Sequence, residues 1–276
     1  MSTITNVFEQ SMQTALYLKK QIDYIPEYAI VLGSGLSSLV DDIEIDKEIS
    51  YKDIPNFPVS TVKGHKGSLI FGSLKGKKVV AMSGRFHFYE GYDMKQVTFP
   101  QRVFWQMGIR KLVVSNASGG VNRNFKIGDV MLITDHINFF PEHPLRGPND
   151  ERFGPRFVNM SEAYSKKMLQ IVRNYAVSKD ISIKEGIYLG LQGPTFETLA
   201  EYTMVRNMGA DAVGMSTVPE VIVAKHMNME VFGISVITDL GTEEFIESVN
   251  HQEVLKAAKR AEPIVRELVG KLVELY

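Results

Sequence analysis

Short apolar runs recur along this chain, and each ends at a glycine-rich or polar segment. Runs of about four to eight apolar residues bounded in this way are typical of strands buried on both faces of a sheet. The predicted strands are residues 28–32, 68–74, 77–82 and 184–191, and the apolar centres of RKLVVSNASGGVN, GDVMLITDHINF, AVGMSTVPE and MEVFGISVITDL. The strands on either side of Lys75-Gly76 are expected to form a hairpin.

Between the strands, apolar residues recur every three or four positions, which predicts amphipathic helices. The predicted helices are residues 5–20, 95–107, 161–177, 197–207, 219–227 and 251–275, with a further helix start after the glycine-rich turn that follows residue 32. Pro100 marks the start of the second helix or a kink in it, and Pro219 opens the fifth. Residues 43–63, with Pro55 and Pro58, are expected to form an irregular connection.

Strands and helices alternate along the chain, and no shift in composition marks a domain boundary. The alternation predicts a single α/β domain over residues 1–276. In it, a twisted, mixed but mostly parallel sheet forms the middle of three layers, and helices flank both faces. Residues 139–158 are the longest stretch without periodicity. They are rich in Phe and Arg, and loops of this length are often functional.

Composition excludes several classes of protein. The 31 basic and 32 acidic residues give a net charge of -1, so no global field attracts nucleic acid or an anionic membrane. The absence of cysteine excludes disulfides, thiolate nucleophiles and cysteine metal sites. The first residues lack the pattern of a signal peptide, and no apolar run approaches the ~20 residues of a membrane span. We expect a soluble, intracellular protein, located in the cytoplasm, that meets any anionic ligand locally.

The segment SGRFHFYEGY, residues 83–92, concentrates chemistry in ten positions. It follows a predicted buried strand, so Arg85, His87 and Tyr89 are expected at or just past a strand end. In open α/β sheets this is where ligands bind. The first two side chains suit an anion, and Tyr89 offers a flat face and a hydroxyl. The competing interpretation is a surface turn whose aromatic residues fill a small satellite core.

Familiar nucleotide motifs are incomplete. GSGLSS at residues 33–38 departs from the dinucleotide fingerprint because Ser38 stands in place of the third glycine, and Asp53 is not at a strand end. GSLIFG at residues 67–72 is followed by Ser73 rather than the lysine of a Walker loop. What remains at the first site is an anion nest of backbone N–H groups at a helix N-terminus, joined by the hydroxyl of Ser34.

Nucleophile and metal motifs are also incomplete. GMSTV at residues 214–218 lacks the last glycine of the serine-hydrolase elbow. The six histidines show no metal-ligand spacing, so no metal site is expected.

The informative pattern is collective, because several strand ends carry polar residues that can converge. Ser34, Arg85, His87 and Ser216 suit a phosphate, since Arg offers bidentate hydrogen bonds and the hydroxyls add more. A flat apolar ring would fit against Phe196, Val213 and Met215. Glu197 and Asp239 are placed to read the polar edge of that ring, and leaving such a buried group unpaired costs about 1–3 kcal/mol.

With these residues the chain resembles a known family, the trimeric purine nucleoside phosphorylases, which are related to methylthioadenosine phosphorylase. The resemblance rests on nine segments in order, namely VLGSGL, VKGHKG, SGRFHFYEGY, VVSNASGGVN, GDVMLITDHINF, GPNDERFGPRF, GPTFET, VGMSTVPEV and NHQEV. Any one of them is weak, but the set is highly specific. It implies the phosphorylase/hydrolase-like fold and a pentosyltransferase reaction. A purine nucleoside and orthophosphate give the free base and ribose 1-phosphate, with no metal or organic cofactor.

The resemblance also implies roles for individual residues. Phosphate would be held by Ser34, Arg85, His87, Ser216 and the backbone of Asn116 and Ala117, with His65 near the mouth of its site. The nucleoside would be contacted by Tyr89, Phe196, Glu197, Val213, Met215, Asp239 and His251, with the last at the 5′-hydroxyl. Phe157 resembles the aromatic residue that a neighbouring subunit lends to the site, which implies a homotrimer. Asp239, His87 and Glu197 are the residues we expect to be catalytic.

One position departs from the 6-oxopurine enzymes, which typically have asparagine where this chain has Asp239. An ionised aspartate would repel the acceptors at positions 6 and 7 of a 6-oxopurine. It must therefore be protonated, or the base must carry a 6-amino group. The methylthioadenosine branch has aspartate there but lacks an equivalent of Glu197, and His251 favours a 5′-hydroxyl. Inosine and guanosine are the expected substrates. Adenosine or methylthioadenosine phosphorolysis is the first alternative, and a non-catalytic nucleoside-binding protein is the second.

Overall fold

A computed structural model describes residues 6–59, 67–241 and 251–276, without the side chain of His251. The strands are β1 (Tyr28–Val31), β2 (Glu44–Ser50), β3 (Ser68–Leu74), β4 (Lys77–Ser83), β5 (Lys111–Gly120), β6 (Val130–Asn138), β7 (Lys184–Gly190), β8 (Ala212–Gly214) and β9 (Glu230–Leu240). The α-helices are α1 (Val7–Lys19), α2 (Met94–Val97), α3 (Phe99–Met107), α4 (Lys166–Ser178), α5 (Leu199–Asn207), α6 (Val218–His226) and α7 (His251–Leu275). Short 3-10 helices are η1 (Ser37–Asp42), η2 (Tyr51–Asp53) and η3 (Phe88–Glu90).

Within the described residues, nine strands form one sheet in the order β2-β3-β4-β1-β5-β8-β7-β6-β9. An additional pairing of β9 with β5 closes the second half of the sheet into a ring. The pairs β1–β4, β1–β5, β5–β9, β6–β7 and β7–β8 are parallel. Four pairs are antiparallel, namely β2–β3, β3–β4, β5–β8 and β6–β9. The prediction of a mixed, mostly parallel sheet is confirmed.

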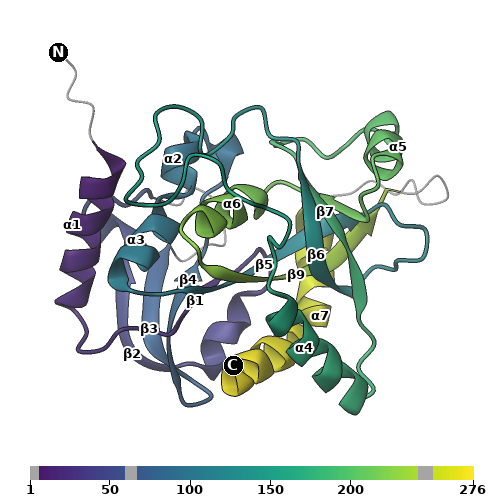
Figure 1. The fold of residues 1–276 in the computed structure, drawn as a ribbon. Coiled ribbons are helices and arrows are strands. Elements are labelled where there is room, and N and C mark those ends of the chain that lie inside the picture. The colour runs from purple at the N-terminus through teal and green to yellow at the C-terminus, as the bar shows by residue number, and fades with distance from the viewer. Residues whose placement is uncertain (1–5, 60–66, 242–250) are drawn as a thin grey trace.

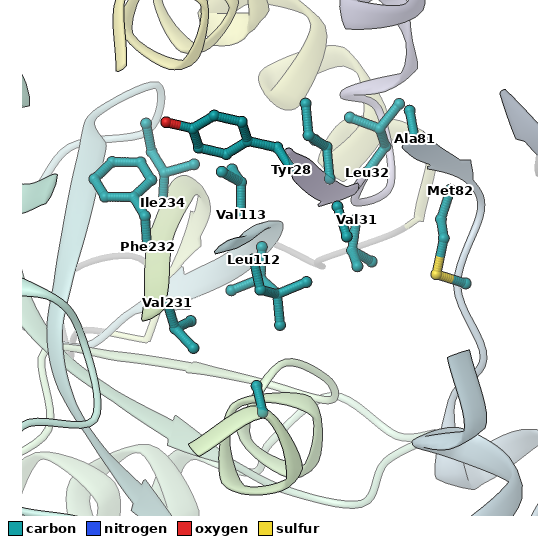
Figure 2. Close-up of a cluster of buried hydrophobic side chains, with 14 of the residues drawn as sticks. Tyr28, Val31, Leu32, Ala81, Met82, Leu112, Val113, Val231, Phe232 and Ile234 are labelled. Carbon is teal, nitrogen blue, oxygen red and sulfur yellow. The ribbon is translucent and has the colours of Figure 1, made fainter. Parts of the chain in front are cut away.

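Helices cover both faces of this sheet (Figure 1). Helix α7 packs on β9 and beside α4. Helix α6 packs on β9 and β6 and against α3, and α1 packs against α3. Figure 2 shows the strands between these layers, with Val113 and Phe232 on one side and Leu112 and Val231 on the other. All four side chains are fully buried. Alternating sides are what the two-residue period of a strand dictates, so both faces of the central strands are apolar.

Several boundaries differ from the sequence-based prediction. Strand β2 was expected to be irregular; it is an edge strand whose residues are mostly exposed, so its sequence EIDKEIS carries little apolar signal. The predicted helix 161–177 begins only at Lys166, because Ser165 caps it by accepting a hydrogen bond from the N–H of Met168. The glycine-rich turn after β1 leads into the 3-10 helix η1 and not into an α-helix.

The hairpin prediction is confirmed: Leu74 pairs with Lys77, and Lys75 and Gly76 both have positive φ angles, as a two-residue turn requires. Residues 95–107 form two helices rather than one, with Pro100 in the first turn of α3. Among the described residues, no helix is both long enough and apolar enough to cross a membrane.

Candidate active site

A cavity of about 570 Å³ opens where strands β1, β4, β5 and β9 reach their C-terminal ends. Parallel strands bring these ends to one edge of the sheet, which is the usual place for a ligand in an α/β fold. The lining residues are Ser34, Arg85, His87, Tyr89, Glu90, Asn116, Ala117, Ser118, Gly119, Pro194, Phe196, Glu197, Val213, Gly214, Met215, Ser216, Thr238, Asp239 and Val254. The volume suits a small organic ligand.

Most of the site residues predicted from the sequence meet in this cavity. Those that line it are Ser34, Arg85, His87, Tyr89, Asn116, Ala117, Phe196, Glu197, Val213, Met215, Ser216 and Asp239. His65 lies outside the described residues, and of His251 the structure describes only its place at the start of α7. Phe157 is 89% exposed and lies away from the cavity, beside His143 and Arg156.

Close packing of two strand ends sets the position of Ser34. Gly33 lies against β5, where a Cβ atom would stand 2.7 Å from the Cα of Asn116, so only glycine allows this approach. The Gly33 N–H also donates to Ser115 Oγ at 3.1 Å. Ser34 therefore sits directly above β5. The anion nest predicted at this turn precedes a 3-10 helix, so it lacks the dipole of an α-helix.

Arg85 is the main cationic side chain of the cavity wall and is 1% exposed. Its Nη1 donates to the carbonyl of Ser115 at 2.7 Å and to Ser216 Oγ at 3.2 Å. Its Nη2 pairs with Glu220 Oε2 at 3.1 Å. Among the described residues, no acceptor is bonded to Arg85 Nε. The buried guanidinium is the main positive charge of the cavity wall, and such a group suits an anionic ligand.

A buried hydrogen-bond chain supports Ser216. Its hydroxyl bonds to that of Thr217 at 3.0 Å, and Thr217 Oγ1 accepts from Asn116 Nδ2 at 2.8 Å. Asn116 Oδ1 accepts in turn from Ser235 Oγ at 2.6 Å. Thr217 has a φ of 67°, a rare and strained conformation for a β-branched residue. The chain therefore holds Ser216 in one orientation beside Arg85.

His87 and Tyr89 form one wall of the cavity, with their rings stacked at 4.7 Å between centroids. Glu90 Oε1 lies 3.0 Å from His87 Nδ1 and also accepts from the His87 backbone N–H at 2.8 Å. Burial lowers the pKa of His87, with Arg85 acting in the same direction and Glu90 opposing. The imidazole is therefore held in a fixed orientation and is mostly neutral near pH 7.

Two carboxyl groups form the other polar cluster of the cavity. Burial raises the pKa of Glu197 to about 7; the charges of Asp239 and Glu201 raise it too, against its own backbone N–H and a hydrogen bond from Tyr202. Burial also raises the pKa of Asp239, against hydrogen bonds from Thr238 and Tyr202. Thr238 Oγ1 lies 2.9 Å from Asp239 Oδ1, and Tyr202 donates to Oδ2 at 3.3 Å. Carboxyl groups with raised pKa values in a cavity are typical of functional sites.

Sequence reasoning missed three residues that hold the site residues in place: Glu90, which itself lines the cavity beside His87, Tyr202, which bonds to Asp239, and Glu220, which pairs with Arg85. Glu220 carries the clearest signal, because it stands three residues after Thr217 as the acid of a capping box and accepts from the Thr217 N–H at 3.1 Å. Its pairing with Arg85 joins positions 135 residues apart, which no local pattern reveals. Within the described part of the chain, no cluster of acidic and histidine side chains could hold a metal ion.

Comparison with known proteins agrees with this geometry. The family model described as the phosphorylase superfamily matches residues 27–274. Purine nucleoside phosphorylase 1 of Geobacillus stearothermophilus is 50% identical, with 90% of each chain covered. The purine nucleoside phosphorylase of Rattus norvegicus is 48% identical over 97% of this chain and 95% of that protein.

Solved structures agree as well. Isoform 2 of the Schistosoma mansoni enzyme, in complex with cytosine and ribose-1-phosphate, superimposes with a TM-score of 0.92 at 40% identity, covering 97% of this chain and 96% of that one. The Schistosoma mansoni purine nucleoside phosphorylase bound to inosine has a TM-score of 0.90, with the same identity and coverage. The chain therefore belongs to the phosphorylase superfamily and, within it, to the purine nucleoside phosphorylases.

Proposed function

We propose that this enzyme cleaves 6-oxopurine nucleosides by phosphorolysis. The substrates are inosine, guanosine and their 2′-deoxy forms. The products are the free purine and ribose 1-phosphate or its deoxy form. The observation that carries this proposal is that two hydrogen-bonded pairs line one cavity, namely Arg85 with Ser216, and Asp239 with Thr238 beside Glu197. Tyr202 supports the second pair from behind. The first suits phosphate and the second suits the polar edge of a purine.

We propose that phosphate binds at the strand ends around Arg85. The guanidinium of Arg85 and the hydroxyl of Ser216 are donors there, and Ser34, His87, Asn116 and Ala117 line the same cavity. His65 is proposed to lie at the mouth of this site. Because Arg85 is already paired with Glu220, its side chain is fixed before the anion arrives, which lowers the entropy lost on binding.

We propose that the nucleoside lies across the remainder of the cavity. Tyr89 and His251 would contact the ribose, whereas Phe196, Val213 and Met215 would cover the apolar base. Glu197, as a carboxylate, would accept the N–H at position 1 of a 6-oxopurine. Asp239, whose pKa is raised by burial, would donate to the nitrogen at position 7 when protonated.

This arrangement needs neither a metal nor an organic cofactor in the proposed reaction. Cleavage of the glycosidic bond places positive charge on the sugar and negative charge on the departing purine. The phosphate anion, held by Arg85 beneath the ribose, stabilises the first and is itself the nucleophile. A proton on Asp239 stabilises the second at position 7. Both interactions strengthen in the transition state, which is where binding energy accelerates a reaction.

A specific observation favours adenosine as a second candidate substrate. Because the pKa of Glu197 is about 7, a large fraction of this carboxyl is protonated at neutral pH. A protonated Glu197 donates to the unprotonated nitrogen at position 1 of adenosine or methylthioadenosine. Among the solved relatives, the Schistosoma mansoni purine nucleoside phosphorylase is in complex with adenosine in one structure, and a Schistosoma purine nucleoside phosphorylase is in complex with guanosine in another.

We expect the substrate preference to depend on pH. As the pH rises from about 6 to about 8 through the pKa of Glu197, the ratio of kcat/KM for inosine to that for adenosine should increase, because ionisation creates the acceptor for inosine and removes the donor for adenosine. Phosphate-dependent cleavage of inosine, guanosine, adenosine and methylthioadenosine, measured side by side across this range, tests it. Dominant cleavage of adenosine or methylthioadenosine with inosine inert would contradict the proposed substrate.

We also propose a cytoplasmic homotrimer in which Phe157 completes the site of a neighbouring subunit. Phe157 is 89% exposed and apolar, which is unusual for a large side chain without a partner. Light scattering should give three times the 31.0 kDa mass of one chain. Phe157→Ala should raise the KM for inosine by about tenfold, because it removes an apolar contact, whereas Val177→Ala, equally exposed on α4, should leave it unchanged. A monomer with full activity would contradict the proposal.

A further inference from the structure

The hydroxyl of Tyr202 lies between the two carboxyl groups of the cavity. It donates to Asp239 Oδ2 at 3.3 Å and also forms a hydrogen bond with Glu197. Tyr202 does not line the cavity, so it reaches a bound purine only through these two groups. Asp239 and Glu197 come from different elements, the end of β9 and the loop before α5, and Tyr202 of α5 joins them.

The packing of its ring fixes the position of this hydroxyl. Tyr202 is 6% exposed and belongs to a small apolar cluster with Val121, Leu189, Val205, Ala210 and Val213. A side chain at Gly241 would overlap the ring, so glycine there leaves room for it. Helix α5 is itself anchored at its first turn, where Thr198 and Glu201 form a capping box. The ring is therefore held in one position, and its hydroxyl is preorganised.

The single proton of the hydroxyl determines how it can bond to the two carboxyl groups. A tyrosine hydroxyl carries one proton, so it donates to one carboxyl and can only accept from the other. Two ionised carboxylates would leave one of these contacts repulsive, so the hydroxyl disfavours ionisation of both groups at once. The neighbouring Glu201 is also negative and raises the pKa of Glu197, which disfavours ionisation of Glu197 beside a charged Asp239.

We propose that Tyr202 is a positioning residue that makes Glu197 and Asp239 act as one unit with a single proton, and so sets which purine edge the enzyme accepts. With the proton on Asp239 and directed at the purine, Tyr202 donates its own proton to the Glu197 carboxylate. The unit then presents an acceptor at Glu197 and a donor at Asp239, the pattern that a 6-oxopurine requires. With the proton on Glu197 the pattern reverses and suits a 6-aminopurine. This inference rests on the proposed placement of the base against these two carboxyl groups.

Tyr202→Phe tests the proposal because it removes the hydroxyl and keeps the ring in its cluster. A hydrogen bond to a charged group is lost, so kcat/KM for inosine should fall by about tenfold to a hundredfold, while the KM for phosphate changes less than about twofold. The hydroxyl also lowers the pKa of both carboxyl groups. The pH at which inosine cleavage reaches half its maximum should therefore move upward, and the inosine-to-adenosine ratio at pH 7 should fall.

Tyr24→Phe is the matched control. The Tyr24 hydroxyl also donates to an aspartate, Asp46, at 2.8 Å, but at the exposed edge of the sheet. It should leave the ratio and the pH midpoint unchanged. An unchanged ratio and midpoint in Tyr202→Phe would overturn the proposal, and so would equal losses toward phosphate and nucleoside with a lowered Tm. If wild-type enzyme cleaves adenosine but not inosine, the proposed substrate fails, yet the pH midpoint of adenosine cleavage still tests Tyr202.

Discussion

We expect Asp239→Ala to lower kcat for inosine by about a hundredfold to a thousandfold, the loss typical of removing one preorganised donor to a developing negative charge. Asp239 is 8% exposed in the cavity wall, and burial raises its pKa, which favours the neutral acid that the proposed donor role requires. The KM for phosphate should stay within about twofold, because Arg85 and Ser216 do not contact Asp239. Steady-state kinetics with each substrate varied in turn separate the two effects.

Asp239→Asn is the matched control for this prediction. The amide of asparagine donates at every pH, so kcat at pH 7 should stay within about tenfold of wild type, and the decline at high pH that comes from ionisation of Asp239 should disappear. The sign follows from the raised pKa: the donating acid is present at low pH and is lost as pH rises. A fall in kcat equal to that of Asp239→Ala, with the pH profile unchanged, would show that Asp239 is not the donor.

The strand ends could be predicted from the sequence because their signal is local. The apolar run before Arg85 ends at Ser83-Gly84, which indicates where the buried strand stops. Arg85 then indicates that an anion could bind just after the strand. The same reasoning applies to Ser34 after β1 and to Asp239 near the end of β9. The C-terminal ends of parallel strands lie at the same edge of a sheet, so residues that follow these strands are expected to be neighbours. The structure brings these residues into one cavity.

Edge strands and helix starts were harder to predict, for physical reasons. In β2 only Ile49 is fully buried, and such a strand needs no alternation to remain at the edge of a sheet. In α4 the boundary depends on which serine caps the helix: both Ser161 and Ser165 precede suitable residues, and the structure uses the second. Local sequence offers two solutions here, and tertiary packing selects one.

The groups that orient the site residues could not be predicted from the sequence. Glu220 bonds to Gln101 at 3.2 Å across 119 residues, and Tyr202 reaches Asp239 across 37. Neither pair has a spacing that favours contact in a helix or a strand. The sequence therefore indicated which groups line the cavity, whereas the groups that hold them in place could be identified only from the fold.

We expect Arg85→Ala to raise the KM for phosphate by about a hundredfold or more, the loss typical of a bidentate charged contact, with a smaller effect on the affinity for nucleoside. It should also lower the free energy of unfolding by about 3–5 kcal/mol, because the Glu220 carboxyl is left buried without its cation. Phosphate titrations at saturating inosine and chemical denaturation measure the two effects separately. Phosphate affinity equal to that of wild type would remove Arg85 from the anion site.

Pairing Arg85→Ala with Glu220→Gln separates the structural role of Arg85 from its role toward the anion. Burial raises the pKa of Glu220 and Arg85 opposes it, so in Arg85→Ala this pKa rises further. A carboxyl with a raised folded-state pKa costs stability as pH rises above its unfolded value, so the deficit should grow as the pH rises above about 5. Glu220→Gln removes the charge and keeps a hydrogen-bonding side chain, so the double variant should regain most of the stability and lose this pH dependence. Its KM for phosphate should stay as high as that of Arg85→Ala, since the donor that meets the anion is still absent. Recovery of phosphate binding together with stability would mean that Arg85 acts only by neutralising Glu220.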